Sequence, residues 1–141
     1  MIEVVNRQRR RKIVAKQWRD FTEKALRAIG RDSWSATIVF VSDDAIKKLN
    51  RRFRGQSLAT DVLSFPTGVE FFEEEDGSHL GDVVISVERA AAQAKENGLS
   101  FSSEVAQLIL HGLLHLCGHD HETDKGRMNR LELKLRRKMG I

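Results

Sequence analysis

The stretch SSEVAQLILHGLLHLCGHDH, residues 102–121, decides the fold, because it predicts a helix from about Ser102 to Cys117 that is apolar on most of its faces. A helix of this kind has to be covered on all sides, so we expect it at the centre of the domain. The same stretch contains four of the five histidines of the chain and its only cysteine. The centre of the fold and the densest group of chemically active side chains are therefore expected together.

Patterns typical of strands and helices alternate around this central helix. Strands are predicted at IEVV (2–5), SATIVFVS (35–42), TDVLSFP (60–66) and LGDVVISVE (80–88). Further helices are predicted at about 13–29, 43–52, 88–97 and 123–139, with Ser42 capping the second of these and an irregular or hairpin-like loop at 67–79. The interleaved order predicts an α+β fold: a small four-stranded mixed sheet with about five helices, one of them the central helix.

Length and composition favour one domain over residues 1–141. The hydrophobic fraction of 40% and the charged fraction of 31% are ordinary for a globular protein in water. No apolar run approaches the roughly 20 residues needed to cross a bilayer, and the N-terminal charges follow the apolar stretch, the reverse of a secretory signal. A single cysteine excludes an intrachain disulfide framework. We expect a cytoplasmic protein that makes no membrane contact.

Basic residues gather at both ends of the chain, and the net charge is +4. This balance favours an acidic partner such as nucleic acid, but only weakly. The clusters are Arg7, Arg9, Arg10, Arg11 and Lys12 at one end, and Lys134, Arg136, Arg137 and Lys138 at the other. Contact with RNA and an ordinary solvated surface are both open at this stage.

His111 and His115 are spaced to form a metal site. Four residues apart on a helix, their rings point to the same side, about one turn apart. In a buried helix an unsatisfied ring nitrogen costs roughly 1–3 kcal/mol, and a shared divalent metal would satisfy one nitrogen of each ring. Gly118 can adopt a positive φ, which would end the helix and let a third ligand from the following HDH approach. Core or capping histidines without a metal are the alternative.

The spacing H-x3-H-x2-G-x2-H matches the zinc pattern of the metzincin proteases and selects His121 over His119 as the third ligand. The expected fold is therefore zincin-like, with a central helix that carries metal ligands. Three neutral imidazoles leave a fourth position for water, whose pKa Zn²⁺ lowers to roughly 7. Ligation by histidine alone also suits nickel or copper. In those proteases a glutamate acting as general base follows the first histidine, whereas here that residue is Gly112. The pattern therefore predicts hydrolysis but argues against ordinary proteolysis.

The other side chains of the segment have less specific interpretations. Cys117 falls on the opposite side of the helix from His115 and is expected in the core. His119 could act as an alternative ligand, as a support for a ligand or as a substrate contact, and Asp120 could orient an imidazole or cap the helix. His79, in the acidic loop, is expected to be exposed.

Three blocks of the chain make it resemble the YbeY family of bacterial metal-dependent endoribonucleases. They are LNRRFRGQSLATDVLSFP (49–66), GDVVIS (81–86) and HGLLHLCGHDH (111–121). The resemblance departs from the usual pattern at His119 and Phe53, where tyrosine is common.

The resemblance implies one Zn²⁺ per chain held by His111, His115 and His121, in agreement with the spacing. It also implies a functional arginine at Arg54, which would offset the negative charge of a phosphodiester in the transition state. A plain surface arginine at a helix end is the alternative for Arg54. Thr60, Asp61 and Ser64 would line the cleft, although Asp61 could equally cap the start of a strand.

The leading hypothesis is a zinc-dependent endoribonuclease specific for single-stranded RNA, with Arg54 and His115 as catalytic residues. The resemblance implies a role in 16S rRNA 3′-end maturation and ribosome quality control, with the small ribosomal subunit or its assembly factors as partners. One alternative is a metalloprotease whose base is Glu104 or Asp61. Another is a non-catalytic ribosome-assembly factor with a structural metal.

Overall fold

The computed structural model describes residues 2–56, 58–66, 79–118 and 126–141. The strands are β1 (Ile2–Asn6), β2 (Ser35–Val41), β3 (Val62–Pro66) and β4 (His79–Ser86). The helices are α1 (Ala15–Ile29), α2 (Asp43–Arg54), α3 (Val87–Asn97), α4 (Phe101–Leu116) and α5 (Arg127–Met139). The predicted α+β fold, with four strands and five helices, is confirmed.

The sheet is mixed, with the strand order β1-β2-β4-β3. β1 pairs with β2 and β2 with β4 in parallel, whereas β3 pairs with β4 in antiparallel register, with Leu63 opposite Val84 and Ser64 opposite Val83. β3 is thus an edge strand. Its short antiparallel pairing follows from the position of Pro66, which lacks an N–H for a sheet ladder and ends the strand.

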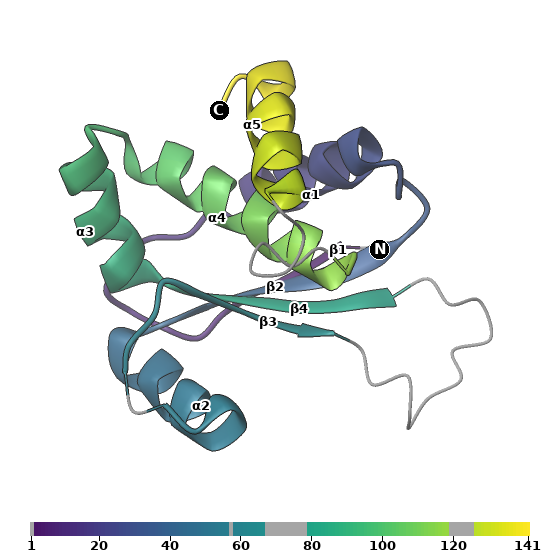
Figure 1. Cartoon of the computed structure of the whole chain (residues 1–141). Coiled ribbons are helices and arrows are strands. Elements are labelled where there is room, and N and C mark those ends of the chain that lie inside the picture. The colour runs from purple at the N-terminus through teal and green to yellow at the C-terminus, as the bar shows by residue number, and fades with distance from the viewer. Residues whose placement is uncertain (1, 57, 67–78, 119–125) are drawn as a thin grey trace.

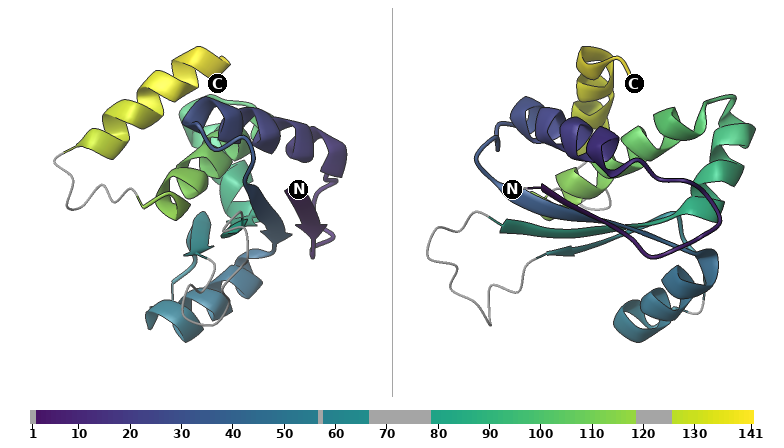
Figure 2. Two further views of the ribbon diagram at one scale, coloured as in Figure 1. Left: turned by 90° about the vertical axis from the view of Figure 1, so that its right-hand side faces the viewer. Right: turned by 180° about the vertical axis from the view of Figure 1, so that it is seen from behind.

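Four helices lie on one face of the sheet, and α2 lies on the other (Figures 1 and 2). α4 is central, as its apolar pattern predicts: it contacts β3 and β4 below and α1, α3 and α5 around it. Ile109, Leu110, Leu113 and Leu114 of α4 are fully buried in the larger core. A smaller core on the other face packs Ile46 of α2 against β2, β3 and β4.

Helix starts follow the predicted capping chemistry. Ser42 Oγ accepts a hydrogen bond from Ala45 N at the start of α2, and Ser86 Oγ accepts one from Arg89 N at the start of α3. α3 begins one residue earlier than expected, because Ser86 ends β4 and caps the helix at once. α2 extends two residues beyond its expected end, which makes Arg54 its last residue.

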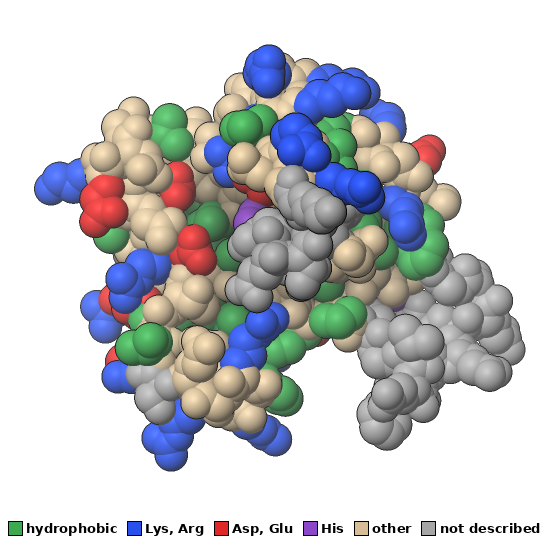
Figure 3. All heavy atoms as spheres, in the orientation of Figure 1, with side chains coloured by type: hydrophobic (Ala, Val, Ile, Leu, Met, Phe, Trp, Pro, Cys, Tyr) green, Lys and Arg blue, Asp and Glu red, His purple; other side chains and the backbone are tan. Residues whose placement is uncertain are grey.

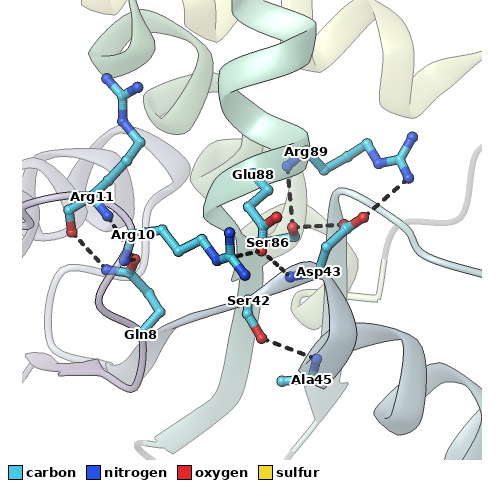
Figure 4. Close-up of polar contacts among 9 residues, drawn as sticks. All are labelled: Gln8, Arg10, Arg11, Ser42, Asp43, Ala45, Ser86, Glu88 and Arg89. Atoms are coloured by element: carbon cyan, nitrogen blue, oxygen red, sulfur yellow. Dashed lines mark hydrogen bonds and ion pairs between the residues drawn. The ribbon is translucent and has the colours of Figure 1, made fainter.

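A polar junction joins the N-terminal loop to the starts of α2 and α3 (Figure 4). Asp43 accepts hydrogen bonds from Ser86 Oγ (2.9 Å) and Arg89 Nη2 (3.4 Å), and its own N–H donates to Glu88 Oε1 (3.0 Å). Arg10 forms an ion pair with Glu88 (3.6 Å). Because β2 and β4 are parallel, both helices start at the same edge of the sheet, where this junction holds them.

His79 is not an exposed loop residue: it is the first residue of β4, is half-buried, and its Nδ1 lies 2.7 Å from Ser35 Oγ. The predicted 67–79 loop falls, apart from His79, outside the described residues. Among the helices that the structure describes, none has the length and apolar character required to cross a membrane.

Candidate metal and substrate site

A cavity of about 730 Å³ lies between the end of α2, β3 and the last turns of α4. Three separate segments supply the polar side chains expected at the site. They are Arg54 from α2, Thr60, Asp61 and Ser64 from β3 and the residues before it, and His111 and His115 from α4. The structure therefore brings together the six residues singled out from motif and resemblance: Arg54, Thr60, Asp61, Ser64, His111 and His115.

The rings of His111 and His115 converge through their Nε2 atoms, which lie 3.1 Å apart. Two nitrogens bound to one tetrahedral Zn²⁺ at about 2.0–2.1 Å would be separated by about 3.3 Å. The observed separation is close to this value, and both rings are partly exposed to the cavity. The donor set and its geometry therefore fit a zinc ion or a similar divalent metal.

Glu132 of α5 fixes the orientation of the His111 ring. Its Oε1 lies 2.5 Å from His111 Nδ1, and Arg136 Nη2 donates to its other oxygen, Oε2. Only 6% of Glu132 is exposed, so its carboxylate has no competing solvent shell. When His111 Nδ1–H donates to Glu132, the lone pair of the neutral ring is on Nε2, the atom that faces His115. A carboxylate behind a histidine is a common support for a metal ligand.

The environment of Glu132 keeps its carboxylate ionised. Burial alone would raise its pKa, but the hydrogen bond and charge of His111, together with Arg136, outweigh burial and lower the pKa below its usual value. An ionised carboxylate accepts a stronger hydrogen bond from His111 than a neutral one would.

Gly112 lies where α4 approaches the sheet most closely. A Cβ atom built on it would lie 2.7 Å from Val83 Cγ1 and 3.2 Å from Ser64 Oγ. Ser64 Oγ also donates to the Gly112 carbonyl (3.1 Å). Position 112 therefore faces the sheet and not the cavity, and no side chain there could act as the general base of a protease.

Arg54 is an exposed residue on the wall of the same cavity. As the last residue of α2, it precedes Gly55, whose φ of +67° ends the helix. Its Nη2 donates to the Ser64 carbonyl over 3.4 Å, a long contact that leaves most of its N–H groups available for an anion. Arg54 is both at a helix end and beside the histidines.

The two carboxylates considered as protease bases are held by other groups. Asp61 Oδ1 accepts from Val62 N (2.8 Å) and Thr60 Oγ1 (3.3 Å), as expected of a cap at the start of a strand. The side-chain amide of Gln93 lies between the two carboxylates. When its nitrogen faces them, that nitrogen donates to Asp61 Oδ2 (3.2 Å) and to Glu104 Oε1 (3.0 Å). Glu104 is 4% exposed and does not line the cavity. This arrangement disfavours the protease alternative.

The remaining residues of the histidine segment are only partly described. Gly118 has a φ of +93° just after α4, as the turn toward a third ligand requires. His119, Asp120 and His121 lie outside the described residues. Within the described residues no three His, Cys, Asp or Glu side chains form a complete metal site. Cys117 packs against the core, and burial raises the pKa of its thiol, as expected of a core residue.

Comparisons with known proteins agree with one another. The family model described as "Endoribonuclease YbeY" matches residues 3–140. Among proteins named Endoribonuclease YbeY, that of Solibacter usitatus is 48% identical over 73% of this chain and 65% of its own length. The one from Koribacter versatilis is 47% identical over 74% of this chain and 64% of its own length. The matched stretches therefore span slightly less than two thirds of these two relatives.

Longer matches are also found. Endoribonuclease YbeY of Geobacter sulfurreducens is 36% identical over 96% of this chain and 91% of its own length. A solution structure of a Thermotoga maritima protein has a TM-score of 0.62 and 31% identity, and the match covers 95% of this chain and 85% of that one. The similarity thus extends from β1 to α5 and includes all the segments that line the cavity.

Proposed function

This chain belongs to the YbeY family of endoribonucleases, and on that premise we propose that it is a zinc-dependent endoribonuclease of single-stranded RNA. The observation that carries the proposal is the convergence of His111 and His115 through Nε2 atoms 3.1 Å apart, in a cavity that Arg54 also lines. His121 is proposed as the third ligand. Residues 1–141 are proposed to form one hydrolase domain.

The proposed site suits a phosphodiester better than a peptide. When bound, Zn²⁺ would supply a water of lowered pKa and polarise a phosphate oxygen. Arg54 would bind the scissile phosphate and offset the charge that develops on it in the transition state. Glu132 would hold His111 in the ligating orientation. No carboxylate among the described residues is free to act as a dedicated base at the histidines, so we expect a slow enzyme or one completed by its partner.

The biological setting is proposed from the family. We expect the RNA to be the 3′ end of 16S rRNA and the partners to be the small ribosomal subunit or its assembly factors, in the cytoplasm, where the enzyme would also serve ribosome quality control. Metal analysis of the purified chain, paired with cleavage of an rRNA 3′-end substrate, tests the proposal. A chain without bound metal and without cleavage would contradict it.

Arg54→Ala is expected to lower kcat for RNA cleavage by about 10²–10³-fold, since that is the usual cost of losing one group that stabilises transition-state charge. Zinc content should stay at the wild-type level, because Arg54 is not a proposed ligand. Single-turnover cleavage of a labelled RNA measures the effect. Arg52→Ala is the control, because Arg52 is an exposed arginine two residues earlier on the same helix end and does not line the cavity; this variant should retain full activity. Equal rates for wild type and Arg54→Ala would exclude the assigned role.

Glu132→Gln is expected to weaken zinc binding by about 10–100-fold, the range found when the support of a ligating histidine is lost. Competition with a chromogenic chelator measures the affinity. Glu104→Gln is the matched control, because Glu104 is equally buried on α4 but contacts Gln93 and Asn97 instead of a histidine. Both variants should lose some stability, and only Glu132→Gln should lose metal affinity. The same affinity in both variants would mean that Glu132 is merely structural.

A further inference from the structure

α5 has two chemically different faces. Its inner face buries Met128, Glu132 and Leu135 against the core and the site. Its outer face exposes cations at intervals of three or four residues, and the only acidic residue of the helix, Glu132, is on the inner face. The exposed cations are Arg127, Arg130, Lys134, Arg137 and Lys138. Residues at this spacing share one side of a helix, so they form a basic stripe about 15 Å long, which we call the α5 stripe.

The two basic clusters of the chain differ in what they contact. In the N-terminal cluster, Arg10 forms an ion pair with Glu88, and the guanidinium of Arg11 lies 4.0 Å from the centre of the Phe101 ring. Gln8 also bonds the backbone of this loop (Figure 4). This cluster follows β1, the edge strand opposite β3, and it helps to hold the loop in place.

Four of the five cations of the α5 stripe are not used in this way. Among the residues that the structure describes, the side chains of Arg127, Lys134, Arg137 and Lys138 form no ion pair or hydrogen bond. Grouping like charges on one helix face is unfavourable unless a polyanion neutralises them. The stripe therefore has the character of a binding surface rather than of an ion-pair network.

The helix that carries the α5 stripe contacts the candidate site through its inner face. Glu132, in the middle of α5, bonds His111, and the stripe occupies the exposed side of the same helix. Figure 3 shows Lys and Arg side chains gathered over α5 on the same face of the molecule on which a histidine is visible. A ligand lying across this face can reach both.

We propose that the α5 stripe binds the phosphate backbone of the RNA substrate outside the cleaved segment. This inference rests on the proposed function, because it assumes that the polyanion beside the site is the RNA that is cut. Five cations over about 15 Å suit a chain with one charge on each nucleotide, whereas an acidic protein segment would have to present carboxylates at the same regular interval.

The C-terminal end of the stripe adds a place for a base. Lys138 lines a second cavity, of about 540 Å³, between α1 and α5, together with Lys24 and Arg27 and with the apolar side chains of Phe21 and Met139. Cations beside an aromatic side chain are typical of sites that bind single-stranded nucleic acid, where phosphates meet the charges and a base stacks on the ring.

The test compares two triple variants that lose the same charge. Arg127→Gln, Lys134→Gln and Arg137→Gln remove three cations of the α5 stripe, and Arg7→Gln, Arg9→Gln and Lys12→Gln remove three exposed cations of the N-terminal cluster. Binding of a fluorescent single-stranded RNA to the full chain is measured by anisotropy as a function of salt. Each phosphate contact contributes about 0.7 to the slope of log K against log [salt], so the α5 variant should lose about 2.

For the α5 variant, a slope change of about 2 corresponds to about 100-fold weaker binding at 0.1 M salt. The N-terminal variant should bind within threefold of wild type. Lys134→Gln alone, at an exposed position, should lower the slope by about 0.7 and guards against misfolding of the triple variant. An unchanged slope in the α5 variant, or equal losses in both triple variants, overturns the proposal. Competition by polyglutamate as strong as by RNA would overturn the RNA assignment.

The further inference and the proposed function fail separately. If wild type cleaves RNA and both triple variants bind it equally, only the role of the α5 stripe is wrong. If wild type binds RNA through the stripe but cleaves none with zinc present, the proposed enzyme is wrong and the stripe remains an RNA-binding surface.

Discussion

Replacing His115 with alanine is expected to remove both zinc binding and RNA cleavage. His115 supplies one of the two Nε2 atoms that converge in the cavity, so its loss leaves His111 as the only described nitrogen facing that point. A bound metal contributes several kcal/mol to phosphoryl chemistry, which corresponds to a rate loss of about 10³-fold or more. Zinc content by elemental analysis and cleavage of an rRNA 3′-end fragment, measured on the same preparation, check the prediction.

His79→Ala is the control for this experiment. His79 is also half-buried and hydrogen-bonded, but it contacts Ser35, the first residue of β2, and it does not line the cavity. This variant should retain both zinc and activity, apart from a small loss of stability. A His115→Ala or His111→Ala protein that still holds one zinc and still cleaves RNA would show that the metal site lies elsewhere.

The features of the fold that depend on local periodicity were predictable from the sequence. The apolar pattern of residues 102–117 placed α4 at the centre of the domain, and the four-residue spacing placed His111 and His115 on one side of the helix. The predicted cap at Ser42 and the predicted positive φ at Gly118 are confirmed, because capping and positive φ are properties of one or two residues. Such features depend on short stretches of chain and need no knowledge of the tertiary structure.

Contacts between distant segments could not be predicted in this way. Glu132 is 21 residues from His111, and a glutamate in a basic amphipathic helix is ordinarily expected on the exposed face. One signal was available: it is the only acidic residue in α5, and it falls on the apolar side with Met128 and Leu135. The expectation that His79 is exposed was wrong because its burial also depends on a distant segment: its partner Ser35 is 44 residues earlier in the chain, in β2.

The interpretation of Gly112 changes once the sheet is in view. In the sequence, Gly112 stands where the metzincin proteases have a glutamate that acts as general base, so its meaning there is chemical. In the structure it is also a packing requirement, because β4 and β3 occupy the space that a side chain would need. The close approach of α4 to Val83 and Ser64 brings the histidines over β3 and so places them in the cavity with Arg54.

Gly112→Glu is therefore expected to destabilise the fold strongly without creating a protease. The new side chain would point at Val83, with Ser64 beside it, and would bring an unpaired charge into a fully packed contact. Overpacking alone typically costs 1–3 kcal/mol, so the total loss of unfolding free energy should exceed about 3 kcal/mol. Urea denaturation measures it, and a peptidase assay on unstructured casein should stay at background.

Gly112→Ala and Val83→Ala together show whether the close contact is the cause. The alanine Cβ would meet Val83 Cγ1 at 2.7 Å, so Gly112→Ala alone should cost about 1–3 kcal/mol. Val83→Ala removes both methyl groups that Cβ would strike, so the double variant should be more stable than the sum of the single losses predicts. Additive losses would mean that the helix tolerates a side chain at position 112 by shifting. In that case the close approach of α4 to the sheet would not explain why glycine stands next to the first histidine.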